Sequence, residues 1–416
     1  MNTFTTIFLI TLFFSSFVQF WLAKRQADHV ANHRSAVPSA FQAKVTLAAH
    51  QKAADYTLDK VKLSNIDGVI SLIVLLVFTL GGIINQVFSY WSTVISSPLL
   101  SGVVSTASIF LLMTLIEIPT SVYQTFVIEE KFGFNKSSVA QFVKDQLLHL
   151  SLGAVIGLPL LALILWTMDN VGSSWWLWAW AIIMGFSLLM SWLYPTVIAP
   201  LFNKFTPMVD GSLKERIQGL LVRCGFNSQG IFIMDGSKRS GHGNAYFTGL
   251  GNNKRIVFFD NLVDSLEEEE LEAVLAHELG HFKCKHVIKM LIATSIMSLI
   301  SLGVLGWLID QDWFYTGLGV ALEQKSHATA LLLFMLVSGT FTFFMQPISA
   351  YFQRKFEFEA DDFAASHAKA SKMISGLVKL YEENANTLTP DPLYSSFHYS
   401  HPPAAIRIAH LETKLS

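Results

Sequence analysis

The stretch His277-Glu278-Leu279-Gly280-His281 has the pattern H-E-x-x-H. Residues four apart lie on one face of an α-helix, so His277 and His281 can present ring nitrogens to one metal ion with Glu278 beside them. Residues 265–275 predict that helix, because Ser265 is a candidate N-cap, four glutamates at 267–270 suit the positive end of the helix dipole, and no proline intervenes. The stretch therefore predicts a zinc site with a base, carried on a helix.

A third ligand is needed, because a five-residue pattern with two free positions also occurs by chance and a catalytic zinc takes three protein ligands. The acidic, helix-compatible run 354–365 holds Glu357 and Asp361, again four residues apart. One carboxylate can bind the metal while the other orients a ligand histidine through its free N–H. The competing interpretation is a solvated acidic helix face, which the histidine motif makes less favourable. Cys284, close after His281, is a weaker ligand candidate than Glu357.

The composition indicates a membrane protein. Of the 416 residues, 52% are hydrophobic and only 14% are charged, and the mean hydropathy is +0.44, which is too apolar for an ordinary soluble enzyme. The net charge of −2 leaves no basic excess to neutralise phosphates, which argues against nucleic acid as a partner. The two cysteines, Cys224 and Cys284, form no C-x-x-C pattern, and we expect reduced thiols facing the cytoplasm.

Seven apolar segments are long enough to span a bilayer. They cover approximately residues 3–22, 66–88, 99–118, 147–168, 175–198, 287–309 and 328–350. We expect the third segment to be broken at Glu117 and Pro119. Between the fifth and sixth segments the chain becomes polar, and residues 230–234 and 255–259 are typical of short strands.

The distribution of basic residues predicts the topology. Lysines and arginines follow the first, third and fifth segments, whereas the other connections carry almost none or are acidic. The positive-inside rule then places the N-terminus outside and the C-terminus inside. With seven spans, the histidine motif before the sixth and the acidic run after the seventh fall on the same, cytoplasmic side.

Several separated motifs, in this order along the chain, resemble the type I CAAX prenyl proteases and their bacterial relatives, a family of integral-membrane zinc endopeptidases. The motifs are residues 126–136, 198–205 and 243–247, the H-E-L-G-H core, and residues 357–361 and 398–403 with Arg407. The resemblance extends over nearly the whole chain. It implies that Glu357, the first glutamate of an E-x-x-A-D pattern, is the third zinc ligand in preference to Glu359. It also implies a large intramembrane chamber enclosed by the seven helices.

The resemblance implies a substrate-binding strand. Its residues are Asn244, Ala245, Tyr246 and Phe247. They resemble an edge strand that pairs with an extended substrate, where backbone hydrogen bonds supply the affinity. An ordinary strand remains the alternative from the residues alone.

The expected catalytic residues are Glu278 and Asp361, from the metal motifs themselves, and His401 and Arg407, which the resemblance implies. Glu278 takes the proton of a zinc-polarised water and delivers it to the leaving amine, and Asp361 supports a ligand histidine. His401 and Arg407 are expected near the substrate and the developing oxyanion. From the residues alone, the alternatives are a loop histidine before Pro402 and a surface charge on the last helix.

The expected fold is mainly α: a multi-pass membrane protein with seven transmembrane helices and a cytoplasmic, gluzincin-like zinc-metalloprotease domain that contains a small β-sheet. Residues 1–199 would hold helices 1–5 and the N-terminal CAAX-protease region, and residues 287–350 helices 6 and 7. Residues 200–286 and 351–416 would form the two parts of the protease domain, the first with the histidine motif and the second with the third ligand. One zinc ion per chain is the expected cofactor.

The expected function is hydrolysis of peptide bonds at the membrane, which in the resembled family removes the C-terminal tripeptide after a prenylated cysteine. The compact length and the lack of an evident organelle-retention tail favour a bacterial protein of the inner (plasma) membrane, where general clearance of membrane or misfolded peptides is equally open. A smaller heat-shock membrane protease shares both metal motifs but has fewer spans, and a seven-span transporter or receptor would make the zinc motif incidental. The expected partners are a peptide or lipidated peptide and membrane lipid, without nucleic acid.

Overall fold

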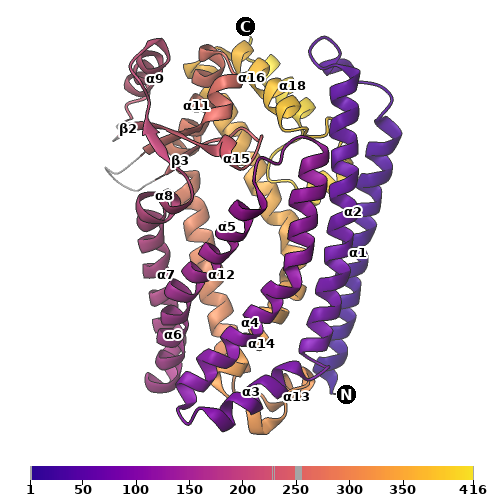
Figure 1. Cartoon of the computed structure of the whole chain (residues 1–416), viewed down its shortest axis with the longest axis vertical. Helices are drawn as coiled ribbons and strands as arrows, with labels where there is room; N and C mark the ends of the chain where they lie inside the picture. Colours follow the sequence, from indigo (N-terminus) through magenta and orange to yellow (C-terminus); the bar gives the residue numbers. More distant parts are fainter. Residues whose placement is uncertain (1, 227, 229, 249–254, 416) are drawn as a thin grey trace.

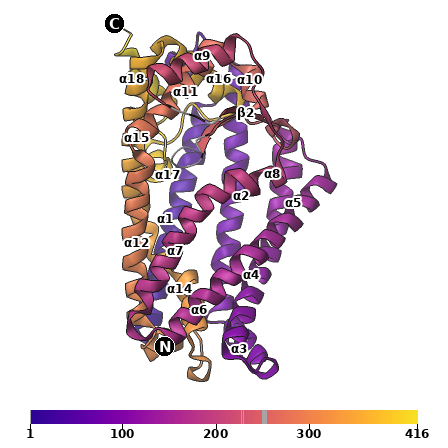
Figure 2. The same ribbon diagram turned by 90° about the vertical axis from the view of Figure 1, so that its left-hand side faces the viewer.

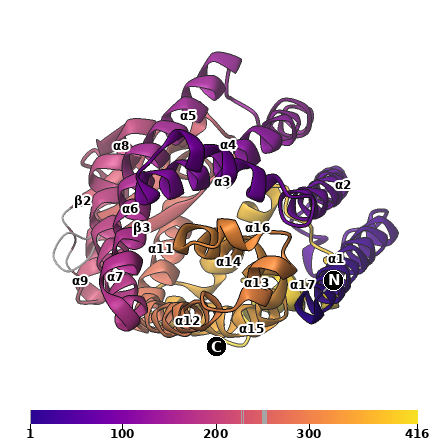
Figure 3. The same ribbon diagram turned by 90° about the horizontal axis from the view of Figure 1, so that it is seen from below.

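The computed structural model describes residues 2–226, 228, 230–248 and 255–415. Over these ranges, seven helical units are long and apolar enough to cross a membrane. They run along the long axis of the molecule, with the N-terminus at one end and the strands, α11 (Glu268–Lys283) and the C-terminus at the other (Figure 1). Viewed along that axis, most of the long helices lie around a ring, with α14 near its middle (Figure 3). The predicted seven-helix membrane fold with a small sheet is confirmed.

Most of the spanning units contain more than one helical segment. They are α1 (Thr3–His33), α2 (Leu47–Phe78), α4 (Pro98–Tyr123) with η2 (Gln124–Glu129), α5 (Val139–Leu152) with η3 (Gly153–Gly157) and α6 (Leu158–Asn170), η4 (Gly172–Ser174) with α7 (Trp175–Leu193), η5 (Tyr194–Ile198) and α8 (Ala199–Phe202), α12 (His286–Leu308), and α14 (His327–Thr342) with η8 (Phe343–Met345) and α15 (Gln346–His367). All but α12 extend beyond the predicted apolar segments, because polar residues continue the helical hydrogen bonds on either side of the bilayer.

Two predicted boundaries are wrong. The second span ends at Phe78, where Gly82 adopts a left-handed conformation (φ 81°) and starts the separate helix α3 (Ile83–Val94). The third span is not broken at Glu117 and Pro119, since α4 contains Pro119 and continues through η2. A proline removes one backbone hydrogen bond, but ending the helix within a membrane would free several more polar groups, each at a high cost.

The sheet has four strands in the order β1-β2-β4-β3. The strands are β1 (Phe205–Pro207), β2 (Gly230–Met234), β3 (Ala245–Thr248) and β4 (Arg255–Phe259). β2 and β4 are parallel, whereas β1 pairs with β2 and β3 pairs with β4 in antiparallel register. The strands predicted at 230–234 and 255–259 are confirmed, and β3 lies at an edge of the sheet.

The remaining helices gather mainly at the two ends of the molecule (Figure 2). They are α9 (Ser212–Arg223), α10 (Asp260–Ser265), α13 (Asp312–Gly317), α16 (Ala370–Glu383), α17 (Pro392–His398), α18 (Ala404–Glu412) and the short turns η1 (Ser39–Phe41), η6 (Gly236–Lys238) and η7 (Leu322–Gln324). One hydrophobic core surrounds α11, at the end of the molecule that carries the C-terminus. Another hydrophobic core lies among the long helices.

The N-cap of α11 lies two residues after Ser265, the predicted N-cap. Glu267 is the N-cap, and it forms a capping box with Glu270, in which each side chain accepts a hydrogen bond from the other residue's backbone. Ser265 instead ends α10. The reciprocal bonds satisfy two free N–H groups at the helix start, which a single serine hydroxyl cannot do.

Candidate metal centre

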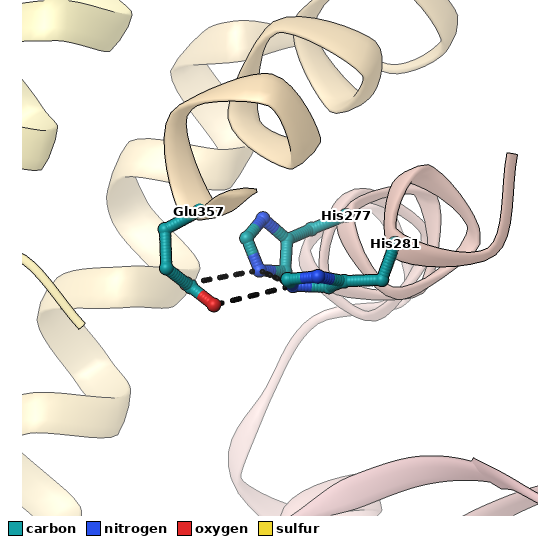
Figure 4. A group of neighbouring side chains, drawn as sticks. All are labelled: His277, His281 and Glu357. Atoms are coloured by element: carbon teal, nitrogen blue, oxygen red, sulfur yellow. Dashed lines mark hydrogen bonds and ion pairs between the residues drawn. The ribbon is translucent and has the colours of Figure 1, made fainter. Parts of the chain in front are cut away.

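Helices α11 and α15 pack so closely that their contact requires a glycine. A side-chain carbon at Gly280 would lie 2.9 Å from the Cα of Ala360 and 3.1 Å from its carbonyl oxygen, which is too short for a real contact. The close approach brings Glu357, one helical turn before Ala360, against the face of α11 that carries the two histidines (Figure 4). Glycine is therefore needed at position 280 of the H-E-L-G-H stretch so that α15 can approach α11.

Nitrogen and oxygen atoms of His277, His281 and Glu357 lie at nearly equal separations. The two Nε2 atoms are 3.2 Å apart, and the Glu357 oxygens lie 3.3 Å from His281 Nε2 and 3.4 Å from His277 Nε2. Ligands about 2.0–2.1 Å from a tetrahedral zinc ion are about 3.3–3.4 Å apart, because a tetrahedron's edge is about 1.63 times its centre-to-corner distance. One Glu357 oxygen, Oε2, is buried and accepts no hydrogen bond from the described residues. The three side chains therefore fit a zinc ion.

The other ring nitrogen of His277 faces a buried carboxylate. Its Nδ1 atom lies 2.8 Å from Asp361 Oδ1, and the Asp361 oxygens also accept hydrogen bonds of 2.9 and 2.6 Å from the Arg407 guanidinium. A carboxylate in this place keeps the proton on Nδ1 and leaves Nε2 free for a metal. Burial and Arg407 lower the pKa of His277, but Asp361 and Glu357 outweigh them and raise it to about 9.

Glu278 borders a cavity of about 670 Å³ that His277 and Arg407 also line. Burial raises the pKa of the Glu278 carboxyl, although the neighbouring His277 and His281 act in the opposite direction. A carboxyl group whose pKa moves towards neutral pH can both accept and return a proton. The cavity therefore has a candidate base beside the three candidate metal ligands.

His401 and the first two residues of the predicted substrate strand reach the same cavity. His401 Nε2 lies 3.4 Å from Glu357 Oε1, and the side chain is largely exposed. Asn244 and Ala245 line the cavity from the start of β3. The structure thus brings the edge strand and the loop before α18 to the candidate metal ligands.

The side chains of Tyr246 and Phe247 do not line this cavity. The Tyr246 hydroxyl lies 3.9 Å from the sulfur of Met234 on β2, and the Phe247 ring packs edge-on against Phe226. Their side chains support the sheet, so a substrate role for these two residues can only use their backbone groups.

Two residues that were not predicted as part of the site lie beside the candidate metal ligands. His286 contacts His281, and Glu359 contacts His286. Their positions in the sequence could have indicated them, since His286 follows His281 by five residues and Glu359 lies inside the E-x-x-A-D pattern. A third, Lys60 of α2, lines the cavity from a helix that is remote in sequence.

The two-histidine helix, the carboxylate supplied by a second helix and the adjoining cavity stand at one end of a seven-helix membrane fold. Together they define a membrane-embedded metallopeptidase. Residues 26–204 match the family described as CAAX prenyl protease N-terminal, five membrane helices, and residues 207–415 match peptidase family M48. The chain belongs to peptidase family M48, and it carries the five-helix N-terminal region of the CAAX prenyl proteases.

Individual relatives agree over almost the full length. The chain is 34% identical to CAAX prenyl protease 1 of Saccharomyces cerevisiae, covering 94% of this chain and 91% of the relative. It is 31% identical to the CAAX prenyl protease 1 homolog of Mus musculus, with 98% and 95% covered. The crystal structure of S. mikatae Ste24p superposes with a TM-score of 0.92 at 31% identity, covering 99% of both chains.

These similarities decide between the classes that the sequence left open. The protein is a membrane zinc metalloendopeptidase that resembles the CAAX-processing proteases, so the transporter or receptor alternative is wrong. The five-helix N-terminal match also argues against the smaller heat-shock protease.

Proposed function

We propose that His277, His281 and Glu357 bind one zinc ion per chain and that Glu278 is the general base of peptide hydrolysis. The observation that carries the proposal is the set of nearly equal separations among the three groups, next to a cavity bordered by Glu278. When bound, zinc polarises the scissile carbonyl and makes a water molecule more acidic.

The side chains around this site then have separate tasks. Glu278 takes a proton from the attacking water and returns it to the leaving nitrogen. Asp361 fixes the tautomer of His277 through the 2.8 Å contact with Nδ1. His401 and Arg407, both lining the cavity, supply donors to the oxygen on which negative charge develops.

The substrate proposed is a C-terminal peptide tail that follows a prenylated cysteine, which is supported by the names of the similar proteases. A cavity of about 670 Å³ has room for a short peptide segment. Among the described residues, β3 pairs only with β4, so its second edge is free to add an extended peptide beside Asn244 and Ala245. General clearance of membrane peptides by the same site is the alternative.

The proposed orientation places the N-terminus outside and the metal centre on the cytoplasmic side of an inner (plasma) membrane, as the distribution of basic loops predicts. In its support, α11 and the metal-binding end of α15 lie at the same end of the molecule, opposite the N-terminus (Figure 1). The four-part division of the chain predicted above is proposed with it.

Dependence on the prenyl group tests the substrate proposal. For purified, detergent-solubilised protein, we expect kcat/KM for a quenched-fluorescent C-terminal peptide to rise at least about tenfold when its cysteine is farnesylated. Burial of only two of the lipid's methylene-sized groups, at about 0.8 kcal/mol each, amounts to about that factor. Equal rates for the two peptides would instead support general peptide clearance.

Lys60 is the proposed partner of the substrate's terminal carboxylate. It lines the cavity, its Nζ lies 4.9 Å from the Tyr56 ring, and it makes no ion pair with the described residues. Arg407, the other permanent cation of the lining, is already paired with Asp361. We expect Lys60→Gln to raise KM about tenfold for a peptide acid, since a hydrogen bond to a charged group contributes about 1.5 kcal/mol or more.

The matched substrate is the same peptide with a C-terminal amide, whose KM should not respond to Lys60→Gln. Lys62→Gln is the matched variant, because Lys62 lies nearby on α2, is exposed and pairs with Asp59. An equal rise in KM for the acid and the amide would show that Lys60 does not read the carboxylate.

Zinc affinity is expected to rise with pH. The pKa of His277 is about 9 in the metal-free site, so zinc must displace a proton from it at neutral pH. For one displaced proton the affinity grows about tenfold per pH unit below that pKa. Chelator competition at pH 6, 7 and 8 measures the slope, and Asp361→Asn should shift the rise to lower pH. A flat affinity over this range would contradict the prediction.

A further inference from the structure

A chain of two hydrogen-bond contacts leads away from His281. Its Nδ1 atom, on the far side of the ring from the metal-binding nitrogen, lies 3.0 Å from Nδ1 of His286. The Nε2 atom of His286 lies 3.0 Å from Glu359 Oε2. His286 is 2% exposed, and its ring stacks on Phe356 with a centroid distance of 4.3 Å and an angle of 14°.

The chain can be protonated in only one order when His281 binds a metal. A metal on Nε2 leaves the His281 proton on Nδ1, which then donates to His286 Nδ1. His286 consequently carries its own proton on Nε2 and donates it to the Glu359 carboxylate. Each contact has one donor and one acceptor, so the geometry satisfies every group of the chain.

We propose that His286 and Glu359 are positioning residues for the ligand His281, an inference that rests on the proposed zinc set. Both ligand histidines then have a partner for their second nitrogen, but the partners differ. Asp361 contacts His277 directly, whereas Glu359 reaches His281 only through the imidazole of His286. Such partners fix the ring orientation and the tautomer of a ligand and raise its basicity.

The connection between α11 and α12 places His286 under His281. Lys285, between the two helices, adopts a left-handed conformation with φ of 58° and ψ of 32°. This conformation is unfavourable for a residue with a side chain and persists where the surrounding structure requires it. It turns the chain so that the first residue of a membrane-spanning helix meets the histidine motif.

A second metal ion on the same groups is the competing interpretation. Ligand atoms of Cys284, His286 and Glu359 lie within 4.8 Å of one another. However, Glu359 Oε2 also accepts a hydrogen bond of 3.3 Å from the Lys289 ammonium, which would oppose a cation there. Moreover, a metal-bound His281 leaves His286 with its Nε2 protonated, so that nitrogen has no lone pair for an ion.

Zinc affinity of the purified full-length protein tests the proposal, by competition between the protein and a fluorescent zinc chelator. We expect His286→Leu to weaken zinc binding about 10- to 100-fold. His286→Gln should recover most of the loss, because an amide can both accept from His281 and donate to Glu359. Cys284→Ser, the matched neighbouring variant, should bind zinc like the unchanged protein.

Two further variants separate the possible failures. If His281→Ala does not weaken zinc binding, the proposed zinc set itself is wrong. If His281→Ala weakens it but His286→Leu does not, only the positioning role is overturned. Two zinc ions per chain, falling to one in Cys284→Ser, would likewise overturn it in favour of a second site. Should His286→Leu fail to fold, Glu359→Gln must still weaken zinc binding, and an unchanged affinity in that variant overturns the proposal.

Discussion

Glu278→Gln is expected to lower kcat for peptide hydrolysis by about 100- to 10,000-fold, the usual contribution of a positioned general base. Glu278 borders the cavity next to His277, and burial raises its pKa towards the range in which a carboxyl group can accept and return protons. Glutamine has the same shape as glutamate but cannot take a proton, and position 278 lies beside the proposed zinc ligands without being one of them. The variant should therefore keep its zinc.

Steady-state kinetics and zinc content, measured on the same preparation, check this prediction. Glu268→Gln is the matched control. Glu268 lies in the first turn of the same helix, away from the cavity, and its carboxylate accepts a hydrogen bond from the Ser212 hydroxyl. The Glu268→Gln variant should hydrolyse peptide at the unchanged rate. If Glu278→Gln hydrolyses as fast as the control, another group is the base.

Arg407→Gln is expected to lower the free energy of unfolding by about 3–5 kcal/mol, the usual effect of removing one partner of a buried ion pair. Arg407 is 5% exposed and Asp361 is fully buried, and two hydrogen bonds of 2.9 and 2.6 Å join them. Without the guanidinium, the fully buried Asp361 carboxylate would lose two hydrogen bonds and keep only the His277 ring as a charged partner. The free energy of unfolding of Arg407→Lys should lie between those of the unchanged protein and of Arg407→Gln, because an ammonium keeps the charge but cannot form the paired contact.

Denaturant or thermal unfolding of the metal-free protein in detergent measures this effect without a contribution from zinc. Lys414→Gln is the control, because Lys414 pairs with Asp362 at 2.9 Å in an exposed position of the same region. Pairs of that kind contribute about 0–1 kcal/mol. If Arg407→Gln and Lys414→Gln lowered the free energy of unfolding by similar amounts, the buried pair would stabilise the protein no more than an exposed pair.

The proposed zinc ligands were predictable because their geometry is local. His277 and His281 share a helix face through their spacing alone, and Glu357 was singled out by an acidic run together with the resemblance to a protease family. The seven spans were predictable for the same reason, since each is a continuous apolar stretch. Local patterns thus gave both the membrane fold and the centre of the site.

The contacts that the sequence did not show depend on how distant segments meet. His286 and Glu359 are 73 residues apart and come together through the left-handed Lys285 and the close packing of α15 on α11. The start of α11 was misplaced because a capping box of two glutamates competed with a simpler serine cap. The third span was misjudged at Pro119, since the membrane environment outweighed the local effect of proline.

Because α15 continues the last membrane span, it fixes the position of the reaction centre along the membrane normal. Glu357 lies eleven residues after Gln346 on one uninterrupted helix, about 16 Å along its axis, and the membrane-spanning helix α12 begins three residues after the end of α11. Both helices that carry the proposed ligands are therefore anchored in the bilayer, and hydrolysis takes place at a set depth. A tail tethered by its own lipid presents the same bond at that depth in every encounter, whereas a free peptide has to find it by diffusion. The depth of the site in the membrane would thus determine which peptide bond of a lipid-tethered tail is hydrolysed.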